Sequence, residues 1–129
     1  MEKFEITATA KTPYIHLDAL SGEMIIEGRA IAQSEDDFWA PVLKWFYAYS
    51  TAPNVSTRFI FNLEYFNIYS SKQILFLLHK LNDIYEEGFN VKVIWKYSIE
   101  DLEMKESGFD FSCVVNVPFE FEELVSVDF

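Results

Sequence analysis

Residues 57–97 read TRFIFNLEYFNIYSSKQILFLLHKLNDIYEEGFNVKVIWKY and contain a predicted strand, a helix and a second strand in succession. Residues 57–65 are rich in β-branched and aromatic side chains, which is typical of a central strand. From 70 to 87 the apolar residues recur with helical spacing, and Gly88 is a natural end for that helix. Residues 90–97 alternate as a strand does. We therefore predict two parallel strands joined by a right-handed crossover helix.

The predicted helix has one apolar stripe with which to pack on the sheet. Its members follow an i, i+3, i+4, i+7 pattern: Ile74, Leu77, Leu78, Leu81, Ile84 and Tyr85. Ser70 and Gln73 have the spacing of a capping box, so we expect the Ser70 hydroxyl to accept a hydrogen bond from the backbone N–H of Gln73. A helix N-terminus also attracts a phosphate, because its N–H groups are unpaired and its dipole end is positive. From these residues alone, an N-cap is the simpler interpretation of Ser70 than a phosphorylation site.

The flanking sequence predicts strands before this unit and further elements after it. The predictions are strands at 3–9, 14–18 and 23–30, a helix that begins at Ser34, a short acidic helix that ends near Gly108, and a strand at 113–117. Strands followed by alternating strands and helices indicate an α/β fold. We expect a single domain over residues 1–129, a sandwich in which helices pack mainly on one face of a mixed sheet.

Composition and charge exclude several classes of protein. The formal net charge is −11, and residues from 86 onward carry −8 of it, with 11 acidic residues against three lysines. Such a field repels nucleic acid and disfavours an anionic membrane surface. No apolar run approaches the roughly 18–20 residues of a membrane span, and the first residues lack the apolar core of a signal peptide. We therefore expect a cytoplasmic protein without membrane insertion.

No set of side chains in the sequence predicts catalysis, a cofactor or a metal site. His16 and His79 have no Cys or second His at metal-binding spacing. Cys113 lies in an apolar stretch, so we expect a small core residue rather than a nucleophile. Four acidic residues lack the glycine turn and alternating ligands of a calcium loop and are interpreted as a solvated helix face: Glu100, Asp101, Glu103 and Glu106.

Six short motifs follow one another along most of the chain. They are TAKTPYI at 9–15, GR at 28–29, FWxP at 38–41, LEYFNxxSSK at 63–72, VxVxWxY at 91–97 and an acidic run at 100–108. In this order they resemble the SiaC-like regulatory phosphoproteins of bacteria, over about residues 6–119. The resemblance implies a fold similar to anti-sigma-factor antagonist (STAS-like) domains, in agreement with the α/β sandwich. It leaves residues 120–129 as an acidic, aromatic tail.

The resemblance implies a non-catalytic switch. A histidine-kinase-like serine/threonine kinase phosphorylates such proteins, a PP2C-type phosphatase reverses the modification, and the unmodified form binds and activates a diguanylate cyclase. The phosphoacceptor of the family is a threonine directly after the asparagine of EYFN, and here that position is Ile68. Isoleucine cannot accept a phosphate, so Ser71 and Ser70 are the alternative acceptors at this junction.

We expect the partner-binding surface at this junction between strand and helix. The candidate residues are Tyr65, Asn67, Ile68, Tyr69, Ser70, Ser71 and Lys72. The first hypothesis is a regulatory module that docks on a signalling enzyme through this surface. The second is a degenerate paralogue that binds a different partner and has lost the switch. A small-molecule enzyme is a third hypothesis, which only a deep polar pocket with a strongly perturbed carboxylate or histidine would support.

Overall fold

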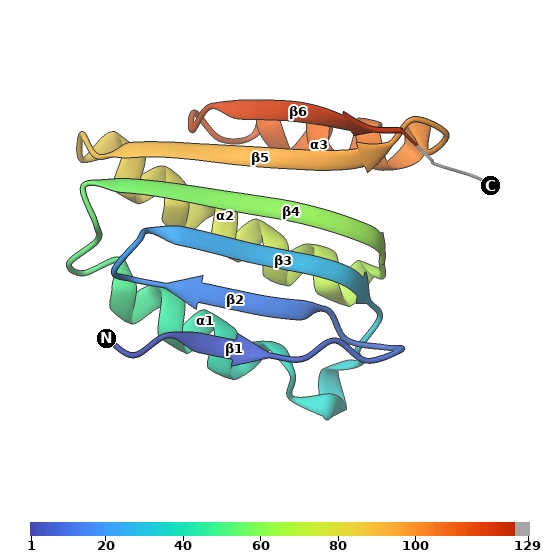
Figure 1. The fold of residues 1–129 in the computed structure, drawn as a ribbon, viewed down its shortest axis with the longest axis horizontal. Coiled ribbons are helices and arrows are strands. Elements are labelled where there is room, and N and C mark those ends of the chain that lie inside the picture. The colour runs from blue at the N-terminus through green and yellow to red at the C-terminus, as the bar shows by residue number, and fades with distance from the viewer. Residues whose placement is uncertain (126–129) are drawn as a thin grey trace.

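Residues 1–125, which a computed structural model describes, form one six-stranded sheet and three α-helices (Figure 1). In chain order the elements are β1 (Phe4–Ile6), β2 (Tyr14–Asp18), β3 (Glu23–Ala30), a 3-10 turn (Ser34–Asp36), α1 (Trp39–Tyr49), β4 (Ser56–Phe66), α2 (Ile68–Glu86), β5 (Asn90–Ser98), α3 (Leu102–Cys113) and β6 (Phe119–Leu124). The strands lie in sequence order; β1 to β3 pair antiparallel and β3 to β6 pair parallel. The predicted mixed sheet is confirmed. None of these helices has both the length and the apolar character needed to span a membrane.

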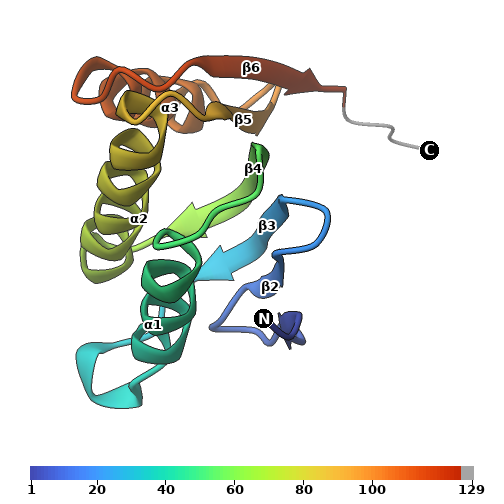
Figure 2. The same cartoon turned by 90° about the vertical axis from the view of Figure 1, so that its left-hand side faces the viewer.

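The three helices lie on the same face of the sheet, and Figure 2 shows this layer from the side. The predicted stripe of α2 is buried, because five of its residues are at most 1% exposed: Ile74, Leu77, Leu78, Leu81 and Ile84. Beneath the helices, the rings of Phe59 and Phe61 stack with their centroids 4.6 Å apart, and Phe61 lies 5.4 Å from Trp95. The sandwich is therefore confirmed, while the likeness to STAS-like domains stays a prediction.

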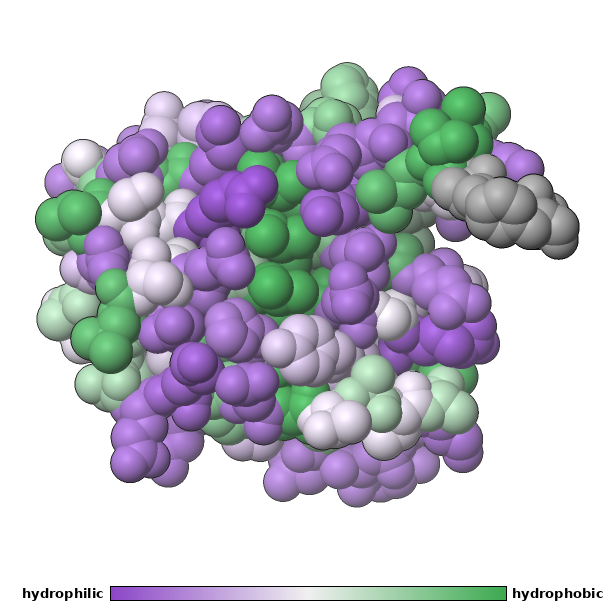
Figure 3. Space-filling view, in the orientation of Figure 1, coloured by the Kyte–Doolittle hydropathy of each residue, from purple (hydrophilic) through white to green (hydrophobic). Residues whose placement is uncertain are grey.

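No helix within residues 1–125 covers the opposite face of the sheet, which is seen in Figure 3. Ile25, Ile60 and Ile94 stand side by side in register across β3, β4 and β5. Ion pairs flank this row: Glu23 with Arg58 at 3.8 Å, Lys92 with Glu120 at 3.4 Å and Lys96 with Glu122 at 3.9 Å. Ile60 is 7% and Ile94 1% exposed, so neighbouring side chains cover the row. This face is largely self-covered.

The first helix begins later than predicted. Ser34–Asp36 form a separate 3-10 turn, and Asp37 after it has a left-handed backbone with a φ of 50°. That conformation interrupts the helical path, because L-residues in a helix have negative φ. α1 starts at Trp39, so Pro41 falls in its first turn, where its missing N–H has no helical partner to lose.

The C-terminal third differs most from prediction. α3 extends to Cys113 rather than ending near Gly108, and Cys113 is exposed rather than a core residue. The predicted strand at 113–117 is wrong; the last strand is β6, which begins one residue before the expected tail at 120–129, occupies its first five residues and pairs with β5. Its first four residues, FEFE, alternate and place Glu120 and Glu122 on the face where Lys92 and Lys96 lie. Residues 126–129 of the predicted tail lie outside the described residues.

Gly108 lies inside α3 because the side chain of Trp95 passes directly beneath it. A Cβ atom on Gly108 would lie 2.4 Å from Cδ1 of Trp95, far inside van der Waals contact. One turn earlier, the indole N–H of Trp95 donates a hydrogen bond to the carbonyl of Met104 at 2.9 Å. The glycine therefore permits close packing of α3 on β5 and does not mark a helix end.

Candidate functional site

The junction at residues 65–72 lies at the carboxyl edge of the parallel strands. β3, β4 and β5 run in one direction, so their last residues, Ala30, Phe66 and Ser98, meet along the same edge. A helix follows each strand, which brings the N-termini of α1, α2 and α3 to this edge as well. Helix N-termini carry free N–H groups, and open α/β sheets bind their ligands at this edge.

Asn67 caps α2 and ties its start to the neighbouring segment. Its Oδ1 accepts a hydrogen bond from the backbone N–H of Ser70 at 2.9 Å. Its own backbone N–H donates to the carbonyl of Ala30 at 3.0 Å, and its Nδ2 donates to the carbonyl of Ala32 at 3.0 Å. The prediction that Ser70 caps the helix is wrong, because α2 begins two residues earlier, at Ile68.

Ser70 is fully buried where α1 meets α2. Its Oγ accepts a hydrogen bond from Nε1 of Trp39 at 3.2 Å, and its side chain has no exposed surface. A kinase needs access to the hydroxyl oxygen, so burial closes Ser70 to phosphorylation in this fold and removes it from the exposed surface. Ser71 is partly exposed, and its hydroxyl donates to the carbonyl of Ile68 at 2.6 Å.

Several predicted partner-binding residues do reach the surface of the junction. Ile68, the first residue of α2, is 79% exposed, and Tyr65, near the end of β4, is 52% exposed. Lys72, one helical turn after Ile68, is also exposed, whereas Tyr69 and Ser71 are partly exposed. The structure therefore gathers an aliphatic, an aromatic and a cationic side chain at the start of α2.

A shallow hollow adjoins this surface between the end of β4 and the start of α3. Its volume is about 220 Å³, and it is lined by Glu64, Tyr65, Phe66, Asp101, Glu103, Met104 and Ser107. Leu102 is 63% and Ile99 44% exposed in the segment that leads into α3. Of these residues only Tyr65 was predicted to bind a partner; Ile99 and Leu102 were not, and the signal that could have found them is two large apolar residues beside and within the acidic run. The carboxyl edge thus combines exposed apolar side chains with acidic ones.

Comparison with known proteins identifies the family. The model of the SiaC family of regulatory phosphoproteins matches residues 6–124. The chain belongs to the SiaC family. The resemblance noted in the sequence is confirmed, and with it the assignment to a family of regulatory phosphoproteins. A search of curated proteins gives no significant match.

Solved structures of SiaC from Pseudomonas aeruginosa share this fold. Apo-SiaC is 21% identical with a TM-score of 0.87, and the match covers 95% of this chain and 99% of that one. A further SiaC structure is 22% identical with a TM-score of 0.86, covering 96% and 100%. In a complex, SiaC is bound as activator to the diguanylate cyclase SiaD; that chain is 21% identical with a TM-score of 0.87, covering 94% and 99%.

The other residues considered for chemistry lie elsewhere in this SiaC-family chain. Within residues 1–125, no group of three or more His, Cys, Asp and Glu side chains is placed to hold a metal ion. Asp101 instead caps α3, since its Oδ1 accepts a hydrogen bond from the N–H of Met104 at 3.1 Å. His79 is exposed on α2, and Nδ1 of His16 lies 3.9 Å from a carboxylate oxygen of Glu5.

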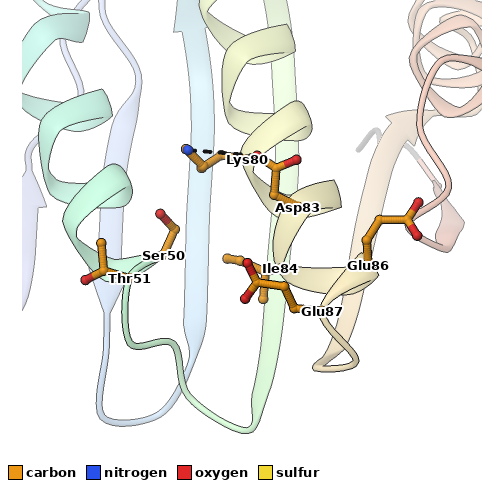
Figure 4. Close-up of a pocket in the computed structure, with 7 residues that line it drawn as sticks. All are labelled: Ser50, Thr51, Lys80, Asp83, Ile84, Glu86 and Glu87. Carbon is orange, nitrogen blue, oxygen red and sulfur yellow. Dashed lines mark ion pairs between the residues drawn. The ribbon is translucent and has the colours of Figure 1, made fainter.

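A larger hollow of about 450 Å³ lies at the opposite end of α2 (Figure 4). It is lined by Ser50, Thr51, Lys80, Asp83, Ile84, Glu86 and Glu87. Nζ of Lys80 pairs with Oδ2 of Asp83 at 3.8 Å, and Figure 4 shows Glu86 pointing away from Ser50 and Thr51. The lining holds three carboxylates, of Asp83, Glu86 and Glu87, and neither a histidine nor a cysteine.

Two shifted pKa values occur on β2, which is separated from β4 by β3. Partial burial raises the pKa of Tyr14, and the Glu5 carboxylate, which accepts a hydrogen bond from its hydroxyl at 3.4 Å, raises it further. Burial alone would raise the pKa of Asp18, but hydrogen bonds from Leu20, whose N–H lies 3.0 Å from Oδ1, and from Ser21 bring it below its usual value. Strand pairing and a turn explain both shifts, and neither indicates catalysis.

Proposed function

We propose that this chain is a cytoplasmic, non-catalytic regulator that binds a diguanylate cyclase through the junction at residues 65–72. Family membership supports the proposal, as does the complex in which SiaC of Pseudomonas aeruginosa is the activator of SiaD. The exposed Ile68 and Tyr65 supply apolar and aromatic contacts of the kind that protein interfaces bury. The proposal extends to a histidine-kinase-like serine/threonine kinase and a PP2C-type phosphatase as further partners.

The phosphorylation step of the switch is proposed to be lost at Ile68, and this residue carries the proposal. It occupies the position of the family's threonine, and its side chain is 79% exposed at the first position of α2. A phosphate there would add about −1.5 to −2 charge beside free helix N–H groups. Isoleucine has no hydroxyl and stays uncharged, so the chain remains in its partner-binding state.

A second candidate is a paralogue that binds a different protein and has no phospho-switch. The low identity to the SiaC structures, 21–22%, leaves room for it, because a shared fold does not by itself imply a shared partner. The apolar Ile68 also changes the chemistry of the junction. Both candidates use the junction to bind a protein, and they differ in which protein they bind.

Calorimetric titration with a purified diguanylate cyclase from the same organism tests the first candidate. Ile68→Glu places a charge at the centre of the proposed surface and should weaken binding at least about tenfold. Val55→Glu is a matched control, because Val55 is also 79% exposed but precedes β4 at the opposite edge of the sheet. Equal effects of the two variants would contradict docking at the junction. Absence of binding to any cyclase of the organism would favour the second candidate.

A further inference from the structure

A groove of about 310 Å³ runs between α2 and α3. It is lined by Phe66, Leu75, Ser107, Asp110, Phe111 and Val114. Its base is aromatic, since the ring centroids of Phe66 and Phe111 lie 6.1 Å apart and Phe111 in turn lies 5.6 Å from Trp95 of the core. The groove is therefore an apolar indentation that rests on packed core side chains.

Exposed apolar side chains lie in the groove and elsewhere on α3. Val114, which lines the groove directly after α3, is 57% exposed. Phe109 and Leu102 on α3 are 59% and 63% exposed, and they line a second hollow on this helix together with Lys105 and Glu106. α3 thus carries apolar side chains that do not pack on the sheet. Exposed apolar side chains that gather in this way mark interaction surfaces, whereas single ones are ordinary.

The charges around the groove are mainly acidic. Asp110 lines it, and Glu103 and Glu106 are exposed on the same helix. On α3, the ammonium of Lys105 lies over the ring of Tyr97 in β5, 5.7 Å from its centroid. Three carboxylates therefore face solvent on this helix against one lysine, so a partner with basic side chains is complementary to it.

We propose that this groove is a docking surface for a protein partner that inserts an apolar side chain flanked by lysine or arginine. The apolar walls take the inserted side chain, and the carboxylates of Asp110 and Glu106 pair with its basic neighbours. The inference rests on the proposed function and deepens it, because Phe66 and Ser107 line both this groove and the hollow beside the junction. One partner would cover both surfaces and meet acidic side chains along each.

Selection from a displayed library of random peptides, with the wild-type chain as bait, tests the proposal. Enriched peptides should carry an aromatic or large aliphatic residue next to lysine or arginine, and their binding should weaken as salt rises. Val114→Asp should weaken binding of these peptides at least about tenfold, because it places a charge in the apolar wall. Val55→Asp is the matched control, since it alters an exposed valine at the opposite edge of the sheet and should change nothing.

A charge reversal tests the basic flank separately. Asp110→Lys should weaken the enriched peptides, and Glu87→Lys, at the far end of α2, should not. Enriched peptides without basic residues, peptides that bind Val114→Asp as tightly as wild type, or a selection that enriches no peptide would each overturn the proposal. Circular dichroism checks that every variant folds. Because no cyclase is present in the selection, its failure is distinguishable from failure of cyclase binding.

Discussion

The indole N–H of Trp39 donates a hydrogen bond to the hydroxyl of Ser70, with 3.2 Å between Nε1 and Oγ. Both side chains are buried, so this bond joins α1 to α2 inside the core. At the same edge Asn67 caps α2 and holds the segment after β3 through the carbonyl of Ala32. The start of α2 is thus fixed by polar contacts on its inner side, and Ile68 is left at the surface.

Ser70→Ala should lower the free energy of unfolding by about 1–3 kcal/mol, because the buried N–H of Trp39 loses its acceptor. Urea unfolding followed by fluorescence measures the loss. Ser71→Ala is the control: its hydroxyl is partly exposed, so its effect should stay within about 0.5 kcal/mol. Equal losses at the two serines would contradict a structural role for the buried one.

Asn67→Ala should cost about 0.5–2 kcal/mol for the lost helix cap. The lost hydrogen bond to the carbonyl of Ala32 should add about 0.5–1.5 kcal/mol. Asn67→Asp keeps the capping oxygen but replaces the Nδ2 donor by a carboxylate oxygen that faces the carbonyl of Ala32, so its unfolding free energy should lie between those of wild type and Asn67→Ala. An aspartate variant as unstable as the alanine variant would mean that the cap contributes nothing.

Leu78→Ala should lower the free energy of unfolding by about 2–5 kcal/mol, because Leu78 is fully buried in the stripe by which α2 packs on the sheet. Phe76→Ala is a control on the same helix, since Phe76 is 49% exposed. Phe76→Ala should lower the free energy of unfolding by less than Leu78→Ala does. Chemical unfolding of both variants gives the comparison, and a loss below about 1 kcal/mol at Leu78 would contradict the packing described.

Gly108→Ala should destabilise the fold by about 1–3 kcal/mol, because the added methyl would overlap the ring of Trp95. In an exposed helix the same change would stabilise by about 1 kcal/mol through helix propensity, so the sign of the effect is diagnostic. Ser107→Ala, one residue earlier on α3, serves as control. A more stable Gly108→Ala variant would show that α3 can move away from β5 at little cost.

The side-chain spacing predicted much of the fold, because helical and strand periods are local properties of the chain. The stripe from Ile74 to Ile84 and the alternation of β5 both placed core residues correctly. Side-chain spacing could not predict which residue caps α2, since Asn67 and Ser70 are both good capping residues. The choice depends on where β4 ends, and that is decided by a backbone hydrogen bond from Asn67 to Ala30 across the sheet.

Packing between distant segments explains the other differences from prediction. Gly108 was predicted to end a helix, but it lies inside α3 because the side chain of Trp95 packs directly beneath it. The FEFEEL segment was predicted to be mostly an acidic tail, but it forms a strand whose glutamates pair with Lys92 and Lys96. At the candidate site, the role of position 68 comes from the family motif and stays a prediction. The burial of Ser70 follows from its contact with Trp39, 31 residues away in sequence, which no local pattern contains.

Affinity for the cyclase before and after incubation with the kinase and ATP tests most directly whether Ile68 keeps the chain in its partner-binding state. Wild type and Ile68→Thr are treated in parallel, and mass spectrometry maps any phosphate. We predict unphosphorylated wild type with unchanged affinity, and an Ile68→Thr variant that is phosphorylated on the introduced threonine and loses affinity. Stoichiometric phosphate on Ser71 or Ser70 of the wild type that abolishes cyclase binding would contradict the account.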